Sequence, residues 1–330
     1  MQVKTYTSAG VYICTISPDI ILTMPSWSAN INAWLGELTI TISDLDRANE
    51  WEIIKITDIH MWSERVLYTW EITRSTHNYD RSGWKTKEVR ALGYYASFSD
   101  VLYKSAGNYE FTKSGNLSDL IGDVVDVYLA AYPGRLTKNI STNTTSVTQE
   151  FSGVSCQTAL STFRKFSDFA FFIRADSVFE YFDLTSATIH KLTLGKHIAD
   201  MKLEYTIEKI INSHTVRYWV GVWDQVTATD SSSVSQYWLH ETYERNITNI
   251  TTATNLANAK IAKNKSQRAS VRIIVTNSYD YYSILPGHLI QVRNYFDGID
   301  MYNVARIDYG QYEATIRLDL YEGINSDLTP

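Results

Sequence analysis

The chain has 330 residues, of which 44% are hydrophobic and 20% charged, so it can bury a sizeable core and is not intrinsically disordered. Its formal net charge of -6 argues against a protein that binds nucleic acid by neutralising phosphates. The two cysteines, Cys14 and Cys156, stand far apart and predict free buried thiols rather than a disulfide framework. No basic leader with an apolar core and no apolar run near ~18 residues occurs, so we expect no signal peptide, no membrane helix and synthesis in a cytoplasm.

The first hundred residues predict strands throughout. Leu38, Ile40 and Ile42 alternate with polar residues, and this period of two is typical of a half-buried strand. Several short strands separated by polar turns predict a barrel or a sandwich over 1–103. The strands are expected at 11–16, 35–42, 50–59, 66–74 and 85–95, with 77–84 as the turn between the last two.

A helix is predicted over 116–134, where the composition changes. Ser118 can cap its start, and the Pro133-Gly134 pair stops it. The apolar residues fall on one stripe at helical spacing, which predicts a helix that packs on a core. They are Leu120, Ile121, Val124, Val125, Tyr128 and Leu129.

The next stretch, 135–154, is rich in Ser, Thr and Asn and predicts a loop with short strands. A second short helix is predicted over 155–169, and a hairpin over 169–184 with its turn at 176–177. Residues 104–190 are therefore expected to form an α+β insert between two β regions.

The β pattern returns from about residue 191. Apolar and polar residues alternate over 201–208, which predicts a strand whose charged side chains face solvent and which opens the second β region. A change of phase at Glu208–Lys209 predicts a bulge or a turn. Later strands are expected at 270–277, 288–296, 301–310 and 313–322, with a turn at 286–288.

One helix is predicted to interrupt this region, over 250–268. Its inner stripe is Ala253, Leu256, Ala257 and Ile261. Its basic residues lie toward the C-terminal end, where they suit the helix dipole and are expected on a solvated face. They are Lys260, Lys263, Lys265 and Arg268.

Motifs for metal, phosphate or nucleophile chemistry do not occur in the sequence: it has no HExxH, CxxC, GxSxG, GxxxxGK[ST] or GxGxxG. His190 and His197 stand seven residues apart and could form a ligand pair, but plain exposure is the favoured interpretation. Cys156 opens a predicted helix, where a dipole could lower its pKa. Its apolar neighbours favour a buried structural thiol instead.

Sequence spacing does not reveal a pair of glycosidase carboxylates, because the candidates, Asp44 with Asp46 and Asp297 with Asp300, lie in turn-like sequence. We therefore predict no catalytic residue, no cofactor-binding residue, no metal ligand and no cofactor. Two aromatic groups could stack on sugars or on a partner, although core and interface packing is favoured. They are Tyr279, Tyr281 and Tyr282, and Tyr218, Trp219 and Trp223.

Four stretches resemble, in their order, the hub proteins of phage tail tips and baseplates. INAWLGELTITISDL is similar to that family's first hairpin, and NLSDLIGDVVDVYLAAYPG to its first helix. SCQTALSTFRKFSDFAFFIRADSVFEYFDL is similar to its helix–hairpin unit. LGKHIADMKLEYTIEKIINSHTVRYWVG is similar to the strand that opens its second barrel, and the later helix and the LPGHLIQVRN strand follow in the same order. The resemblance covers nearly the whole chain.

The resemblance implies a mainly β fold, in which two tail-tube-like β-barrel domains, 1–103 and 191–330, flank the α+β insert at 104–190. The helix at 250–268 is expected within the second domain. The implied function is that of a structural hub and not of an enzyme. Three subunits would place six barrels in a ring that closes the distal end of the tail tube, matches its sixfold symmetry to a threefold tip and forms part of the DNA-ejection channel.

The implied partners are two further copies of the chain in a homotrimer and several tail components. These are the tail tube or a distal tail protein above, the tape measure protein in the lumen, and a fibre, spike or receptor-binding protein below. DNA is expected only in passage, and stable membrane association is not expected. The implied location is the virion, at the phage tail tip, after synthesis in the host cytoplasm. Many family members continue into an enzyme or a fibre-like extension, whereas this sequence ends at Pro330, so we expect a compact hub.

Two other classes of function stay open. One is a carbohydrate-recognising receptor-binding module of the β-sandwich type, in which Trp219 or Trp223 would contact glycans. The other is a glycan-cleaving enzyme, which would need two carboxylates at catalytic separation in a cleft.

Overall fold

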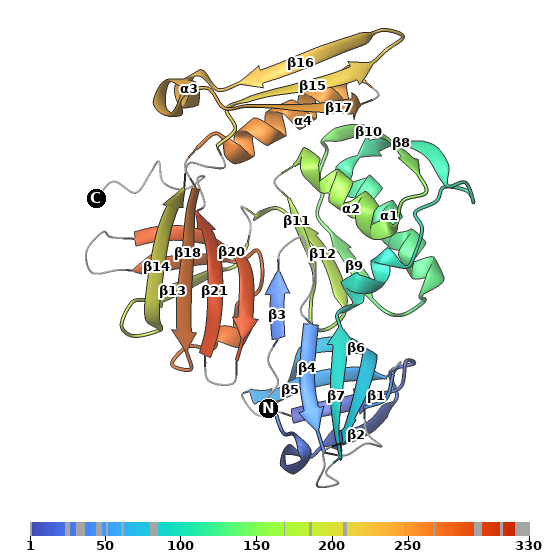
Figure 1. The fold of residues 1–330 in the computed structure, drawn as a ribbon, viewed down its shortest axis with the longest axis vertical. Coiled ribbons are helices and arrows are strands. Elements are labelled where there is room, and N and C mark those ends of the chain that lie inside the picture. Colours follow the sequence, from blue (N-terminus) through green and yellow to red (C-terminus); the bar gives the residue numbers. More distant parts are fainter. Residues whose placement is uncertain are drawn as a thin grey trace.

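The computed structural model describes most of the chain, and within it the fold is mainly β (Figure 1). One large sheet is built from early residues and another from late residues, and the helices of the insert lie beside them. The described residues are 2–23, 27–30, 37–43, 48–50, 52–60, 63–79, 85–167, 169–184, 187–206, 210–247, 249–266, 268–293, 299–310 and 313–320.

The first sheet has six antiparallel strands in the order β2-β1-β5-β6-β7-β4. The chain that follows β2 returns to β4, where the Leu22 N–H donates to the Thr41 carbonyl at 2.8 Å and the Ser43 N–H to the Ile20 carbonyl at 2.9 Å. The sheet is therefore curved, and these bonds join its two edges at one end rather than along their length. The strands are β1 (Gln2–Tyr6), β2 (Tyr12–Ile16), β4 (Glu37–Ile42), β5 (Ile53–His60), β6 (Ser63–Tyr79) and β7 (Lys85–Leu92).

The predicted alternation sets the inner face of this sheet, because Leu38, Ile40 and Ile42 are all fully buried. β6 departs from the prediction, since residues 67–70 are buried on both faces. The insert covers the second face, and the Thr69 hydroxyl donates to the Ala175 carbonyl there at 2.9 Å.

The predicted turn at 77–84 is wrong at its start. β6 runs on to Tyr79, which pairs with Lys85 of β7, so residues 77–79 are strand. The polar side chains of this stretch suit a strand end that projects into solvent. Residues 80–84 of the predicted turn lie outside the described residues.

The insert contains two α-helices and two small sheets. β8 pairs with β10, and β11, β12 and β9 form the other sheet. The predicted hairpin over 169–184 is confirmed, because β11 and β12 are antiparallel neighbours. The elements are η2 (Tyr94–Ser99), β8 (Glu110–Asn116), α1 (Leu117–Ala131), β9 (Thr137–Ile140), β10 (Ser146–Ser152), α2 (Cys156–Phe163), η3 (Arg164–Phe166), β11 (Ala170–Ile173) and β12 (Val178–Phe182).

Both predicted helices of the insert are present, with corrections at their starts and ends. Ser118 does not cap α1: Asn116 holds the N-cap position, and the Ser118 hydroxyl instead donates to the Asn143 carbonyl at 3.2 Å. α2 is capped by Ser155, whose hydroxyl accepts from the Thr158 N–H at 3.2 Å, and it ends at 163 where a 3-10 turn follows. The predicted stripe of α1 is buried at Leu120, Ile121, Val124, Val125 and Tyr128.

The second sheet has the strand order β13-β19-β20-β21-β18-β14, with β3 paired to β20 beside this path. β13 and β14 lie at the two ends of this order, yet a tight turn joins them, in which the His197 N–H donates to the Thr193 carbonyl at 2.9 Å. The second sheet therefore also curves until its edges meet at one end. The strands are β3 (Trp27–Asn30), β13 (Ile189–Thr193), β14 (Ile198–Thr206), β18 (Arg268–Thr276), β19 (Leu289–Arg293), β20 (Ile299–Tyr309) and β21 (Glu313–Leu320).

Between β14 and β18 the chain leaves the second sheet and forms a separate three-stranded sheet, in the order β16-β15-β17. The sequence predicts one helix here and no separate sheet. α4 covers one face of this sheet with its predicted inner stripe, which is buried. The elements are β15 (Ser213–Trp219), β16 (Trp223–Thr229), α3 (Ser231–Tyr237), β17 (Glu241–Ile247) and α4 (Ile250–Asn264).

The strand predicted over 201–208 is present as β14, but its apolar face is less buried than the alternation indicates. Leu203 is exposed, because β14 lies at the edge of the second sheet and pairs there with β18 alone. The predicted bulge at Glu208–Lys209 lies outside the described residues. Among the helices of the described ranges, none has the length and apolarity needed to cross a bilayer.

Candidate functional site at the junction of the two sheets

β3 carries the chain from one large sheet into the other. It belongs to the first β region in sequence but pairs antiparallel with β20, from Trp27 opposite Tyr309 to Asn30 opposite Arg306 (Figure 1). β20 is long enough to pair with two strands in succession. Its first part pairs with β19 and its last part with β3. Four residues offer too short a pattern for sequence reasoning to assign this strand to its partner. The second sheet is therefore completed by a strand from the first β region.

An aromatic cluster fills the space beside β3. The Trp27 side chain is 3% exposed, and its ring stacks on Tyr309 at 5.4 Å and on Tyr282 at 5.9 Å between centroids. Trp70 of β6 meets the same indole edge-on at 5.8 Å. Aromatic contacts of this kind add to the free energy of burial. The rings therefore join β6 of the first sheet to β20 of the second.

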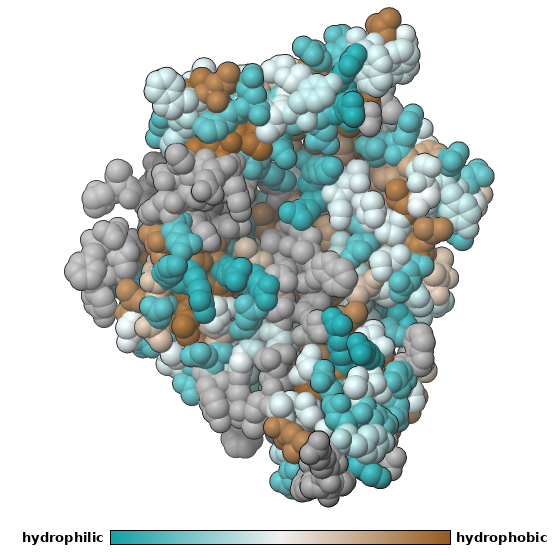
Figure 2. Space-filling view, in the orientation of Figure 1, coloured by the Kyte–Doolittle hydropathy of each residue, from teal (hydrophilic) through white to brown (hydrophobic). Residues whose placement is uncertain are grey.

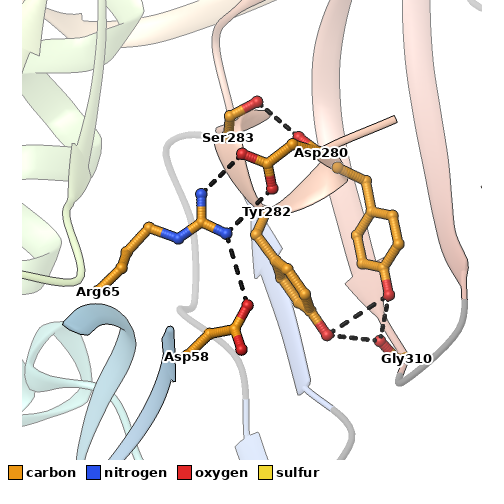
Figure 3. A network of polar contacts seen from close by, with 7 residues as sticks. Asp58, Arg65, Asp280, Tyr282, Ser283 and Gly310 are labelled. Atoms are coloured by element: carbon orange, nitrogen blue, oxygen red, sulfur yellow. Dashed lines mark hydrogen bonds and ion pairs between the residues drawn. The ribbon is translucent and has the colours of Figure 1, made fainter. Parts of the chain in front are cut away.

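An ion pair lies at the same junction (Figure 3). The Arg65 guanidinium of β6 donates two hydrogen bonds to the Asp280 carboxylate, at 2.7 and 3.0 Å. Asp58 of β5 lies 3.9 Å from the same guanidinium. The Arg65 and Asp280 side chains are 26% and 33% exposed, so the paired fork–fork geometry is partly shielded from water. This pair ties the first sheet to the loop before β19.

That loop is itself held to the second sheet. The hydroxyls of Tyr281 and Tyr282, in η5 (Tyr281–Ser283), both donate to the Gly310 carbonyl at 3.1 Å (Figure 3). The Ser283 hydroxyl donates to the Asp280 carbonyl at 2.6 Å. Burial raises the pKa of the Tyr282 hydroxyl well above its usual range, so the hydroxyl stays a donor even in alkaline solution. Asp280 is thus presented to Arg65 by a fixed loop.

The insert contacts the first sheet through a second ion pair. The Arg135 guanidinium donates to Glu71 of β6 at 2.8 Å, with the two side chains 19% and 13% exposed. The same guanidinium lies 4.1 Å from the Tyr132 ring centroid. The insert is thereby held against β6, which also explains the double burial of that strand.

The insert also contacts α4 of the small sheet. The Thr148 N–H donates to the Thr252 hydroxyl at 3.0 Å, and that hydroxyl lies 3.2 Å from the Thr148 carbonyl. Lys263 donates to the Ser167 carbonyl at 2.5 Å, and Lys265 pairs with Asp230 at 3.1 Å. The predicted solvated basic face is therefore wrong at Lys263, which contacts the insert, whereas the Lys265 side chain, just past the end of α4, stays 42% exposed. The side chain of Arg268, the last of the four, lies outside the described residues.

His190 is buried, so the exposure predicted for it is wrong, and it pairs with His288 rather than with His197. The His288 Nδ1 atom accepts from the Leu285 N–H at 3.3 Å, so the His190 Nε2 atom, 2.8 Å away, is the donor of the pair. His190 Nδ1 then accepts from the Tyr279 hydroxyl at 2.9 Å. Burial lowers the pKa of both rings, that of His288 to about 4. Both rings are therefore neutral, and in the described residues no three His, Cys, Asp or Glu side chains gather as a metal site.

The predicted buried thiol is confirmed at Cys156, which is fully buried at the start of α2. Burial raises its pKa to about 12, so the thiolate that a nucleophile needs is not formed at neutral pH. Cys14 is only half-buried, and its sulfur lies 3.2 Å from the Thr5 hydroxyl.

A shallow hollow of about 530 Å³ lies along α1 and carries the carboxylates of Asp119, Asp123 and Asp126. Two of them have structural partners: Asp123 pairs with Lys113 at 3.0 Å, and Asp126 with Lys138 at 2.5 Å. The carboxylates of Asp123 and Asp126 are therefore both engaged in ion pairs within the insert. Asp44, Asp46 and Asp297 lie outside the described residues, as does the side chain of Asp300.

The two aromatic groups singled out in the sequence have different surroundings. Tyr281 and Tyr282 belong to the junction, and Tyr279 contacts the histidine pair, so this group packs inside the molecule. Tyr218 is buried under α4. Trp219 and Trp223 differ, because both are about half exposed at the end of the β15–β16 hairpin.

No known family model and no curated protein matches the sequence. Solved structures match it by fold. The tail protein from Neisseria meningitidis MC58 has a TM-score of 0.69 at 11% identity, over 98% of this chain and 97% of that one. The prophage tail protein gp18 from Listeria monocytogenes EGD-e has a TM-score of 0.67 at 10% identity, over 98% and 95%. The 43 kDa tail protein of prophage MuSo2 from Shewanella oneidensis has a TM-score of 0.66 at 13% identity, over 96% and 98%.

The chain therefore has the fold of phage tail proteins, over almost its whole length. The resemblance inferred from the four ordered stretches is confirmed at the level of the fold, as is the mainly β class. The identities are too low for any contact or residue role of those proteins to be assigned to this chain by likeness.

Proposed function

We propose that this chain is the structural hub of a phage tail tip, a homotrimer that closes the distal end of the tail tube. The observation that carries the proposal is the junction described above, in which β3 and the Arg65–Asp280 pair hold two curved sheets in one fixed relation. A ring subunit needs this rigidity, because each chain must present its two curved sheets at a fixed angle to a tube of sixfold symmetry.

The finer parts of the proposal follow from this arrangement. Three chains place six curved sheets around one axis, facing the tail tube or a distal tail protein on one side and a fibre, spike or receptor-binding protein on the other. The tape measure protein and then the DNA pass through the lumen. The net charge of -6 suits a channel wall that does not retain DNA. The protein then acts in the virion without catalysis, with no metal, no cofactor and no stable membrane association.

A carbohydrate-recognising module is the second candidate, and the exposed Trp219–Trp223 pair is the observation behind it. The two rings meet at 63°, with centroids 5.1 Å apart, and the Arg217 guanidinium lies 4.7 Å from the Trp223 ring. A sugar platform needs free and roughly coplanar ring faces, whereas here one face is covered and the rings are tilted. We therefore favour the hub.

Native mass spectrometry of the purified chain, together with a glycan-binding assay, separates the two candidates. The hub predicts a species of three times 37.7 kDa and no glycan binding. A monomer that binds glycans, and loses that binding on Trp219→Ala or Trp223→Ala, would replace the hub with the receptor-binding module.

A further inference from the structure

The β15–β16 hairpin ends in an unusually apolar tip. Trp219, Val220, Gly221, Val222 and Trp223 are consecutive, and the four side chains among them are 47% to 67% exposed. The two tryptophans pair across the hairpin, and the Val220 N–H donates to the Val222 carbonyl at 3.1 Å. Gly221 forms the turn at a φ of +85°. Figure 2 shows hydrophobic surface at this projecting end of the molecule. The tip is therefore an apolar projection with a hydrogen-bonded turn.

One face of the small sheet is open behind this tip. Val216 and Tyr218 of β15 are buried on the side of α4, so the alternation of the strand places Arg217 and Trp219 on the opposite face. α4 contacts β10 and η3 of the insert as well as β15 and β16. It therefore lies between the small sheet and the insert, as Figure 1 also shows. Within the described part of the chain, the face that carries Arg217 is turned outward.

Two arginines lie one step behind the tryptophans. The Arg217 guanidinium is 4.7 Å from the Trp223 ring centroid, so it lies on the same face as the rings. Arg245 of β17 is exposed, and it follows Glu244, which pairs with Val216 of β15. Arg245 therefore stands level with Arg217. Two residues of a strand span ~7 Å, so the arginines follow the tryptophans at about that distance.

The carboxylates of the same three strands are placed elsewhere. Asp224 accepts from the Tyr218 hydroxyl at 2.9 Å, on the side of α4. Glu244 lies 3.5 Å from Lys165 of η3. Glu241 pairs with Ser213, at the end of the sheet opposite the tip. Among the described side chains of β15, β16 and β17, the outward face next to the tip therefore has positive charge only.

We propose that this tip enters the interface of a membrane that contains anionic phospholipid. The side chains follow one another in the order of the layers of a bilayer. The valines reach the acyl chains, and the tryptophans lie at the boundary, where this residue is enriched. The arginines then reach the phosphates, which attract cations near the surface. The hydrogen bond within the turn lowers the cost of this depth, because unpaired backbone groups are costly in lipid.

The contact is weak and reversible. A single myristoyl chain binds a membrane with a constant of about 10⁴ M⁻¹, and one hairpin tip buries less apolar surface than such a chain. The inference therefore agrees with the absence of stable membrane association proposed above. It goes beyond the proposed hub and does not depend on it, although three tips on one ring would bind more tightly through avidity.

Flotation of the full chain with vesicles tests the contact. We expect binding to vesicles of phosphatidylcholine and phosphatidylglycerol in equal parts. Trp219→Ser/Trp223→Ser should lower the bound fraction by about fivefold or more. Arg217→Gln/Arg245→Gln should lower it to the level seen on phosphatidylcholine alone, because the phosphates then lose their cations. Trp238→Ser is the matched control, since that ring is 84% exposed outside the tip, and it should bind as wild type does.

A fluorescent label reports which part of the chain enters the lipid. Cys14→Ser removes the half-buried native thiol, and Cys156 is fully buried, so a cysteine added at the surface takes the label. An environment-sensitive dye on Val222→Cys should shift its emission to the blue when vesicles are added. The same dye on Trp238→Cys should keep its emission.

The outcomes separate this inference from the hub. A wild type that stays unbound, a Val222→Cys label that does not shift, or full binding by Trp219→Ser/Trp223→Ser would each overturn the membrane contact. Loss of the trimer in that double variant, without vesicle binding by wild type, would assign the tip to another copy of the chain instead. Native mass spectrometry measures the trimer independently, so a monomer that binds vesicles through the tip would overturn the hub alone.

Discussion

Arg65 and Asp280 stand 215 positions apart in the sequence, and their side chains meet at 2.7 and 3.0 Å. Neither residue shows in the sequence that it will have this partner, because each stands in an ordinary polar context. The junction thus depends on individual side chains that only the folded chain brings together. The Arg65–Asp280 pair and the His190–His288 pair each allow a quantitative prediction at the scale of single residues.

Arg65→Ala leaves the Asp280 carboxylate partly buried without its bidentate partner. We expect the free energy of unfolding to fall by about 1–2 kcal/mol, a value kept low because both side chains are about a third exposed. Urea titration measures it. Lys202→Ala removes a solvent-exposed pair with Glu204 and should leave the urea midpoint at the wild-type value. An equal effect of the two substitutions on unfolding would mean that the junction pair stabilises the fold no more than an exposed surface pair does.

The histidine pair predicts a loss of stability in mild acid. Both rings have folded-state pKa values below the ordinary value of 6.5, that of His288 at about 4. The unfolded chain therefore binds protons first, and stability present above pH 6.5 is lost as the pH falls toward 4. At about 1.4 kcal/mol per pKa unit, the loss is of the order of 1–3 kcal/mol.

Thermal unfolding followed between pH 7.5 and pH 4 checks this prediction. His288→Gln should flatten the acid limb of the profile, whereas His77→Gln, at an exposed position, should keep the wild-type profile. A His288→Gln profile that matches wild type at every pH would show that the pair does not titrate as proposed.

At the scale of elements, long alternating segments were predictable from sequence and short or shared ones were not. Leu38, Ile40 and Ile42 alternate over a whole strand and are buried as expected. β3 has four residues and a partner nearly 280 positions later, so local pattern carries no information about its sheet. β15 and β17 follow the same period as the strands of the two large sheets, and their departure into a separate sheet depends on α4, which covers them.

For the candidate site residues, too, features set by local sequence were predictable and contacts between distant segments were not. The burial of Cys156 was predictable because its apolar neighbours are local in sequence. The His190–His288 pair was not, since the sequence offers His197 as the nearer partner and the parallel pairing of β13 with β19 decides otherwise. Paired strands bring distant residues together, and such pairings are not visible in local periodicity.

The role of β3 gives a prediction at this scale. Trp27→Ala removes the ring that packs on Trp70, Tyr282 and Tyr309, and we expect a loss of about 3–5 kcal/mol in the free energy of unfolding. The two large sheets should then unfold in separate steps, visible as two transitions in calorimetry. Trp238→Ala, at an exposed ring, should change the free energy by no more than about 0.5 kcal/mol. One unchanged transition in the Trp27 variant would contradict the role given to β3.

At the scale of the whole molecule, the chain combines two curved sheets, an insert that contacts the first sheet and α4, and a small sheet whose β15–β16 hairpin ends in the exposed Trp219 and Trp223. Each large sheet is joined to the other by backbone pairing, by aromatic packing and by an ion pair. This arrangement has the fold of phage tail proteins and supports our proposal of a rigid ring subunit.

The rotational symmetry of the assembled protein tests the central claim most directly. Averaged electron micrographs of the purified oligomer should show a ring with a central hole, threefold symmetry and six lobes, one for each large sheet. A compact twofold dimer, or a threefold particle with only three lobes and no hole, would contradict the account of a hub that matches a sixfold tube to a threefold tip.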